Sequence, residues 1–292
     1  MIKININDKL YPSNLRKIKD PPQFLYIEGN KNILNNFSVS VVGSRIHSEY
    51  GQKMCEKFTK ELVEYNITII SGMAKGIDSI AHNTCIENGG TTIAVLPSGL
   101  NNIYPSQNKE LYYKIIDSGG TIISEYDPNS EYDKKKPIER NRIVSGLSIA
   151  TLVVEAGYNS GSSITAKLAM QQGKNVFCIP SSLENRKGCT SNELIKKGGK
   201  LVTCTKDIIE QYPELKKNIS KTSNEIAKEQ VEEVIVNEEY IDIYKIITEK
   251  SIHINEIYKK SKLSINEVNY KLMMLEIEGN IIQLPGKNFI RK

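Results

Sequence analysis

Short apolar runs alternate with longer amphipathic stretches between residues 38 and 212, and this alternation constrains the fold more than any other feature of the chain. The runs fall near residues 38–42, 67–70, 91–96, 121–124, 149–154, 175–179 and 200–203. The segments between them carry apolar side chains at helical spacing. Strands that alternate with helices of this length form βαβ crossovers. We therefore predict an α/β fold, with an extended Rossmann-like, mostly parallel sheet flanked by helices.

The pattern divides the chain into four parts. Residues 1–37 are predicted to be an extended N-terminal arm, because Pro12, Pro21 and Pro22 interrupt any helix there. Residues 38–212 are the predicted Rossmann-like domain, and the polar residues 213–239 are a predicted linker. Residues 240–292 carry three groups of helix-spaced apolar side chains and then a β-ribbon. That order predicts a small winged helix-turn-helix domain.

The composition narrows the classes of function. The five cysteines are scattered and form no Cys-x-x-Cys pair, and the three histidines lie far apart. We therefore predict no disulfide framework, no metal site and no cofactor, and we expect a cytoplasmic location. The first residues carry no apolar core of a signal peptide, and no run approaches the roughly 20 apolar residues of a membrane span, so we expect neither feature. The net charge of +5 fits a nucleic-acid partner without requiring one.

Three of the predicted strands end in turns of small residues that also hold a cation or hydroxyl groups. Such turns let a ligand approach the backbone, and helix starts direct free N–H groups at it. Because the carboxyl ends of parallel strands meet at one edge of a sheet, this edge is predicted to bind phosphate groups. The candidate binding residues are Gly43, Ser44, Arg45, Ser71, Gly72, Lys75, Gly76, Arg140, Asn141, Arg142, Ser160, Gly161, Ser162 and Ser163, with Asp78, Glu155 and Thr165 in supporting roles.

Individual roles are predicted for several of these side chains. One of Arg140 and Arg142 is expected to contact phosphate and the other to be structural. Asp78 is expected to orient its turn rather than to act as a general base. Glu155 is expected to orient a ligand or to be a buried partner of Arg140. No catalytic residue is predicted.

Expectations also follow for two aromatic side chains outside this set. His82 is expected on a helix surface. The chain has no tryptophan, so stacking on a base falls to a tyrosine such as Tyr104.

The ordered motifs resemble the DprA/Smf family of bacterial DNA-processing proteins. The matching segments are residues 11–12, 20–22, 43–45, 71–78, 104–105, 124–126, 140–148, 154–156, 160–166 and 192–195. The resemblance implies a homodimer that binds single-stranded DNA and delivers it to the RecA recombinase. The chain departs from the family pattern at Pro137 and Ile138, where Phe-Pro is usual, and at Ser181. The N-terminal SAM-like domain common in the family is expected to be absent.

The cationic sheet edge favours a non-enzymatic protein that binds single-stranded DNA, and the resemblance implies a mediator that protects incoming single-stranded DNA and loads RecA onto it during natural transformation or recombination. Two alternatives remain open at this point. One is a phosphoribohydrolase-like enzyme that uses Glu155, and the other is a sensor of a small nucleotide. The third helix of the winged domain holds Lys271 against Glu267, Glu276 and Glu278. That charge balance favours contact with protein rather than with a DNA major groove.

Overall fold

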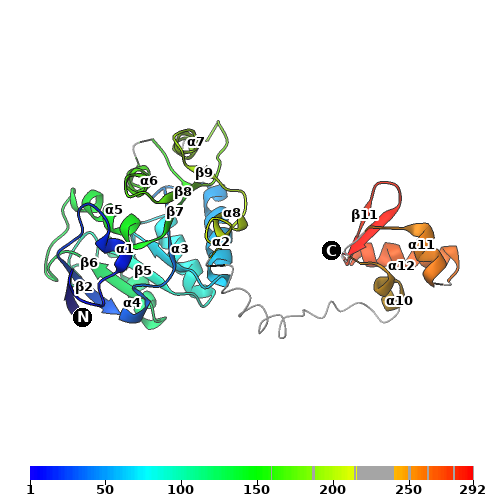
Figure 1. Ribbon diagram of the computed structural model, residues 1–292, viewed down its shortest axis with the longest axis horizontal. Helices are drawn as coiled ribbons and strands as arrows, with labels where there is room; N and C mark the ends of the chain where they lie inside the picture. The colour runs from blue at the N-terminus through cyan, green and yellow to red at the C-terminus, as the bar shows by residue number, and fades with distance from the viewer. Residues whose placement is uncertain are drawn as a thin grey trace. The chain divides into compact units, whose positions relative to one another are not determined.

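The computed structural model describes residues 1–158, 160–185, 188–213, 215, 240–248, 251–261, 263–278 and 280–291. The chain divides into two compact units, Met1–Ile219 and Ser220–Lys292 (Figure 1). Most of the predicted linker, residues 214 and 216–239, lies outside the described residues.

A nine-stranded sheet in the order β1-β2-β6-β5-β4-β3-β7-β8-β9 forms the centre of the first unit. Its strands are β1 (Ile2–Asn5), β2 (Phe24–Gly29), β3 (Ser38–Gly43), β4 (Thr68–Ser71), β5 (Thr92–Val95), β6 (Thr121–Ser124), β7 (Ala150–Glu155), β8 (Asn175–Cys178) and β9 (Lys200–Leu201). All pairs from β6 to β9 are parallel. The predicted α/β fold with a mostly parallel sheet is therefore confirmed.

Helices cover both faces of this sheet (Figure 1). One face packs against α1 (Ser13–Arg16), α5 (Lys136–Leu147), α6 (Gly161–Gln171) and α7 (Cys189–Lys196). The other packs against α2 (Glu49–Glu64), α3 (Ile77–Glu87), α4 (Lys109–Asp117) and α8 (Lys206–Ile209). Two short 3-10 helices, η1 (Lys31–Ile33) and η2 (Ser106–Asn108), complete the unit. The central strand β7 is buried along its whole length, as a strand between two helical layers must be.

Two segments of residues 1–37, Ile2–Asn5 and Phe24–Gly29, are strands of the sheet. Strands β1 and β2 pair antiparallel with each other, and β2 pairs antiparallel with β6. The apolar side chains Leu25 and Ile27 are buried in the core that α5 and α6 cover. The prolines prevent a helix, but they leave Phe24–Gly29 free to pair as a strand.

The order of the strands creates a switch point between β3 and β7. The chain runs outward from β3 through β4 and β5 to β6, then returns to β7 on the opposite side of β3. Loops leaving the carboxyl ends of β3 and β7 consequently diverge to opposite faces of the sheet. A crevice opens where they separate, and ligands of open α/β sheets bind at this position.

The second unit is a winged helix, as predicted. It contains α10 (Ile241–Ile246), β10 (Ile252–His253), α11 (Ile254–Ser261), α12 (Ile265–Ile277), β11 (Ile281–Leu284) and β12 (Asn288–Arg291). The three strands form a sheet in the order β10-β12-β11. Ser264 and Glu267 form a capping box at the start of α12.

Candidate nucleic-acid interface

A cleft of about 470 Å³ lies at the switch point. Its walls come from the loops after β3, β4 and β7, and from the first turns of α5 and α6. A second cavity of about 340 Å³ adjoins it and shares Arg45, Gly72 and Arg140 in its lining. Among the predicted residues, the two cavities together are lined by Gly43, Ser44, Arg45, Gly72, Lys75, Asp78, Arg140, Asn141, Ser160, Gly161, Ser162 and Thr165.

Arg140 is a buried cation in the floor of the cleft. Only 4% of its surface is exposed, and its Nη1 donates to the carbonyl oxygens of Gly72 and Val95. Burial lowers the pKa of Arg140 to about 10, while the nearby Asp78 carboxylate opposes that shift. The guanidinium is therefore charged at neutral pH. Its Nε has no hydrogen-bond partner among the described residues.

Gly72 is required by the position of that guanidinium. A Cβ atom at Gly72 would lie 2.5 Å from Nη1 and 2.6 Å from Cζ of Arg140. The flat guanidinium thus rests directly on the backbone where β4 ends. Any larger residue at position 72 would displace the charged group from the floor of the cleft.

Asp78 organises the turn that leads into α3. Its Oδ2 accepts hydrogen bonds from the backbone N–H groups of Gly72, at 3.2 Å, and Ala74, at 3.3 Å. Burial raises the pKa of Asp78 above its ordinary value, although Arg140 and these donors act in the opposite direction. A carboxylate that is occupied by its own turn in this way orients the loop.

The turns after β3 and β4 pack against each other. Gly76 has φ +81°, and a Cβ atom there would lie 2.4 Å from the carbonyl oxygen of Ser44. The N–H of Ile77 donates to that same oxygen at 3.1 Å. Gly76 therefore holds the two turns together from behind, and it is not itself part of the cleft lining.

The start of α6 forms the opposite wall. Ser160 caps the helix, and its Oγ accepts from the N–H of Ser163 at 3.2 Å. Asn141 Nδ2 and Thr165 Oγ1 both donate to the carbonyl oxygen of Gly161, at 3.2 and 3.1 Å. Asn141 thereby ties α5 to the first turn of α6, where N–H groups lack partners within the helix.

Three further cations reach the cavities from exposed positions. Arg45 lines both of them, Lys134 lines the larger one, and Lys75 lines the smaller one. The only carboxylate among the described residues that line either cavity is Asp78. The surface is therefore cationic, with one fixed charge from Arg140 and mobile charges around it.

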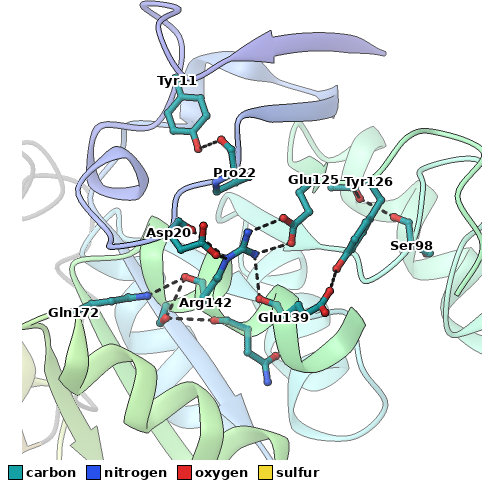
Figure 2. A network of polar contacts seen from close by, with 12 residues as sticks. Tyr11, Asp20, Pro22, Ser98, Glu125, Tyr126, Glu139, Arg142 and Gln172 are labelled. Carbon is teal, nitrogen blue, oxygen red and sulfur yellow. Dashed lines mark hydrogen bonds and ion pairs between the residues drawn. The ribbon is translucent and has the colours of Figure 1, made fainter. Parts of the chain in front are cut away.

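Arg142 is bound by two carboxylates outside the cleft. Its Nη1 and Nη2 bind both oxygens of Glu125, at 2.6 and 2.7 Å, and its Nε donates to Asp20 Oδ2 at 3.2 Å (Figure 2). It does not line either cavity. Since α5 turns by about 100° per residue, two positions after Arg140 face a different side of the helix. Of the two arginines, Arg140 is the one that lines the cavities.

Glu155 is also not the partner of Arg140. Its carboxylate accepts from Ser48 N at 2.8 Å, from Ser48 Oγ at 2.7 Å and from Asn185 Nδ2 at 2.8 Å. These contacts secure the start of α2, and Glu155 does not line the cavities. Ser71 and Ser163 likewise use their hydroxyl groups to donate to the backbone, to the carbonyl oxygens of Val41 and Ser160.

The expectation that His82 lies on a helix surface is wrong. The side chain is fully buried, and its Nδ1 lies 2.7 Å from Thr92 Oγ1. Helix α3 is covered by α2 and α4, so it has little exposed surface. His82 therefore belongs to the buried layer between α3 and the sheet.

Tyr132, which was not among the predicted residues, stacks on Tyr104. The two ring centroids are 3.6 Å apart, with 17° between the planes. Tyr132 lines the larger cavity and Tyr104 the smaller one. The two residues are far apart in the sequence, and no local pattern signals their contact.

Two domain families match the chain. Residues 3–213 match the family described as DNA recombination-mediator protein A, and residues 229–287 match the DprA winged helix domain. No helix of the described residues is long and apolar enough to cross a membrane. In the same residues, no group of three His, Cys, Asp or Glu side chains could hold a metal ion.

Named relatives agree with these families. The chain is 41% identical over 208 residues to DNA processing protein DprA of Streptococcus pneumoniae, covering 71% of this chain and 73% of that protein. It is 40% identical over 210 residues to Protein Smf of Escherichia coli, covering 71% of this chain but only 55% of that protein.

Two solved structures are similar as well. The X-ray structure of pneumococcal DprA aligns with a TM-score of 0.68 at 41% identity, over 72% of this chain and 73% of that one. A Helicobacter pylori DprA structure aligns with a TM-score of 0.65 at 29% identity, over 73% of this chain and 96% of that one. The latter was described for its single-stranded DNA binding mode.

Proposed function

The chain belongs to the DNA recombination-mediator protein A family, also called DprA or Smf, and on that premise we propose that its cleft binds the backbone of single-stranded DNA. The observation that carries the proposal is the cationic cleft at the switch point, with buried Arg140 in its floor. Arg45 and Lys75 supply mobile charges, and the first turn of α6 supplies N–H donors. The single-stranded DNA binding described for the H. pylori relative supports the same assignment.

In this proposal the protein is a mediator and not an enzyme. Glu155, the one carboxylate considered for hydrolysis, is bound by Ser48 and Asn185 outside the cleft. Asp78 is bound by the amides of its own turn. Nothing in the described site favours the hydrolase or the nucleotide-sensor alternative over DNA.

Substitution of Arg45 tests the proposed grip. Arg45→Ala removes an exposed cation from both cavities without disturbing a buried contact, so the fold should be retained. We expect affinity for a single-stranded oligonucleotide to fall by about 1–2 kcal/mol, or roughly five- to thirtyfold, at moderate salt. The plot of log K against log salt should become shallower by about 0.7 for one lost phosphate contact.

The matched control is Lys57→Ala on α2. Lys57 is a half-exposed cation whose nearest carboxylate is Glu61, at 4.0 Å, and it lines neither cavity. Lys57→Ala removes the same unit of charge as Arg45→Ala. Because Lys57 lies outside the cavities, this variant should keep an affinity for single-stranded DNA and a salt slope close to those of the wild type. Equal binding by Arg45→Ala and the wild type would refute the grip.

We propose further that the protein loads RecA onto the strand that it holds, and that it acts as a homodimer. Support for loading comes from the recombination-mediator family to which residues 3–213 belong. Loading would appear as faster RecA ATP hydrolysis on DNA that is first coated with single-strand-binding protein. Light scattering of the purified chain would determine its oligomeric state.

The winged-helix unit is not proposed to read duplex DNA through α12. The single cation of that helix, Lys271, is paired with Asp242 on α10, with Nζ 2.9 Å from Oδ2. The exposed surface of α12 carries Tyr270, Met273 and Ile277 beside its carboxylates. An acidic and partly apolar helix suits a protein contact better than a groove lined by phosphates.

A further inference from the structure

A third cavity, of about 430 Å³, adjoins the cationic surface and differs from it in character. Its lining consists of Asn101, Asn102, Ile103, Tyr104, Ser106, Lys109, Glu131 and Tyr132. It holds one cation and one carboxylate, whereas the larger cleft holds three cations against Asp78. The charge thus changes from cationic to balanced between neighbouring cavities.

The stacked pair Tyr104–Tyr132 stands at this boundary. Both rings line the third cavity, while Tyr132 also lines the larger cleft and Tyr104 also lines the smaller one. Of the described residues that line these three cavities, Tyr104 and Tyr132 alone are aromatic. Neither ring is buried, so the pair is accessible from the cavities.

The loops that carry the pair are held in place by backbone contacts. The N–H of Gly99 donates to the carbonyl oxygen of Ser130 at 2.8 Å, and the N–H of Asn101 donates to that of Pro128 at 2.9 Å. Asn102 Nδ2 donates to the carbonyl oxygen of Asn129 at 2.7 Å. The rings are therefore presented by a joined pair of loops and not by a loose tip.

We propose that the Tyr104–Tyr132 pair is a base-stacking platform, on which a nucleobase lies in the third cavity while the adjoining phosphates occupy the cationic cleft. A nucleotide consists of a charged backbone and a neutral flat base, and the change of lining across the pair matches this division. Aromatic side chains bind bases of any sequence because every base has a π-face. The inference rests on the proposed binding of single-stranded DNA and specifies where the bases lie.

The test compares two ligands of equal length and charge. One is an oligothymidine, and the other carries the same phosphates and sugars without bases. We expect the wild type to bind the oligothymidine about five- to a hundredfold more tightly, the range for stacked bases. In Tyr104→Leu and Tyr132→Leu, the ratio of the affinity for oligothymidine to the affinity for the strand without bases should fall toward one. Tyr104→Phe and Tyr132→Phe keep the rings and should keep the preference.

The outcomes separate this inference from the proposed function. A purely structural role of the pair would lower the thermal midpoint of the Leu variants but leave the preference for bases intact, which would overturn the platform. Salt-dependent binding of both strands with equal affinity would also overturn it, while leaving the phosphate grip in place. Binding of neither strand would overturn both proposals. Arg45→Ala should weaken the binding of both ligands by the same factor and leave the preference for the strand with bases unchanged.

Discussion

Burial separates residues that the sequence presents as equivalent. Arg140 and Arg142 lie two positions apart in one basic segment, yet one forms the floor of the cleft and the other binds Glu125 (Figure 2). Their roles depend on which side of α5 each faces, and on carboxylates that are remote in sequence. The sequence could reduce the choice to these two residues but could not decide between them.

His82 is a buried polar residue whose protonation state follows from its hydrogen bonds. Thr92 Oγ1 donates to the carbonyl oxygen of Ile69 at 2.8 Å, so it must accept from His82 Nδ1. That network assigns the proton to Nδ1 and leaves Nε2 without a partner among the described residues. Burial, together with the Arg140 charge, lowers the pKa of His82 to about 3.

A pH dependence of stability follows from this shift. The unfolded histidine has a pKa near 6.5, so between about pH 6.5 and pH 3 the unfolded state binds more protons than the folded state. The stabilisation is complete above pH 6.5 and is lost on acidification, by up to about 1.4 kcal/mol per pH unit. Urea unfolding of the wild type at pH 7 and pH 5 measures this loss.

His82→Asn is the matched variant, because its amide can still donate to Thr92 but does not titrate. It should be less stable at pH 7 and lose less stability between pH 7 and pH 5 than the wild type does. If both proteins lose the same amount, the buried neutral histidine is not the cause.

At the scale of elements, α5 links the site to the rest of the first unit. Its C-terminal end is bound by Lys174, whose Nζ donates to the carbonyl oxygens of Ser145, Gly146 and Ser148 at 2.6–2.7 Å. Gln172 Nε2 donates to the carbonyl oxygen of Arg142 at 3.1 Å (Figure 2). A helix held at several points keeps Arg140 and Asn141 in fixed positions at the cleft.

The ion pair of Arg142 is predicted to stabilise this arrangement without binding DNA. The side chains of Arg142 and Glu125 are only 18% and 15% exposed, so Arg142→Met leaves a poorly solvated carboxylate. Because the pair is only partly buried, we expect a loss of about 1–3 kcal/mol in the free energy of unfolding, the cost of leaving the carboxylate without its partner. The salt slope of DNA binding at a temperature where the variant is folded should match that of the wild type.

Asp20→Asn provides the comparison. The Asp20 side chain is 82% exposed, so its removal from the same cluster should cost less than about 1 kcal/mol. A shallower slope of log K against log salt in Arg142→Met than in the wild type would show that the Arg142 guanidinium contacts phosphate.

The strands of the sheet were predictable because each is a short apolar run between turn residues. The pairing of β2 within residues 1–37 was not predictable, since it joins β2 to β6, a segment almost a hundred residues further along the chain. The Tyr104–Tyr132 contact was hidden for the same reason. Local patterns predict elements and the edge where a site lies, but contacts between distant loops depend on the assembled fold.

At the scale of the whole molecule, the two units differ in what they offer a nucleic acid. The first has a concave cationic cleft beside an aromatic pair, which suits a flexible strand with accessible bases. In the second, α12 exposes carboxylates and apolar side chains, and its lysine is paired. The chain as a whole should therefore favour single strands over duplex.

The affinity of the full chain for a labelled single strand and for the matching duplex, measured across a salt titration, tests whether the cleft binds single-stranded DNA. We expect tighter binding of the single strand, by about tenfold or more, and a log K that falls linearly with log salt with a slope of about −0.7 per phosphate contact. Equal affinity for single strand and duplex, or binding that salt does not weaken, would contradict the proposed binding.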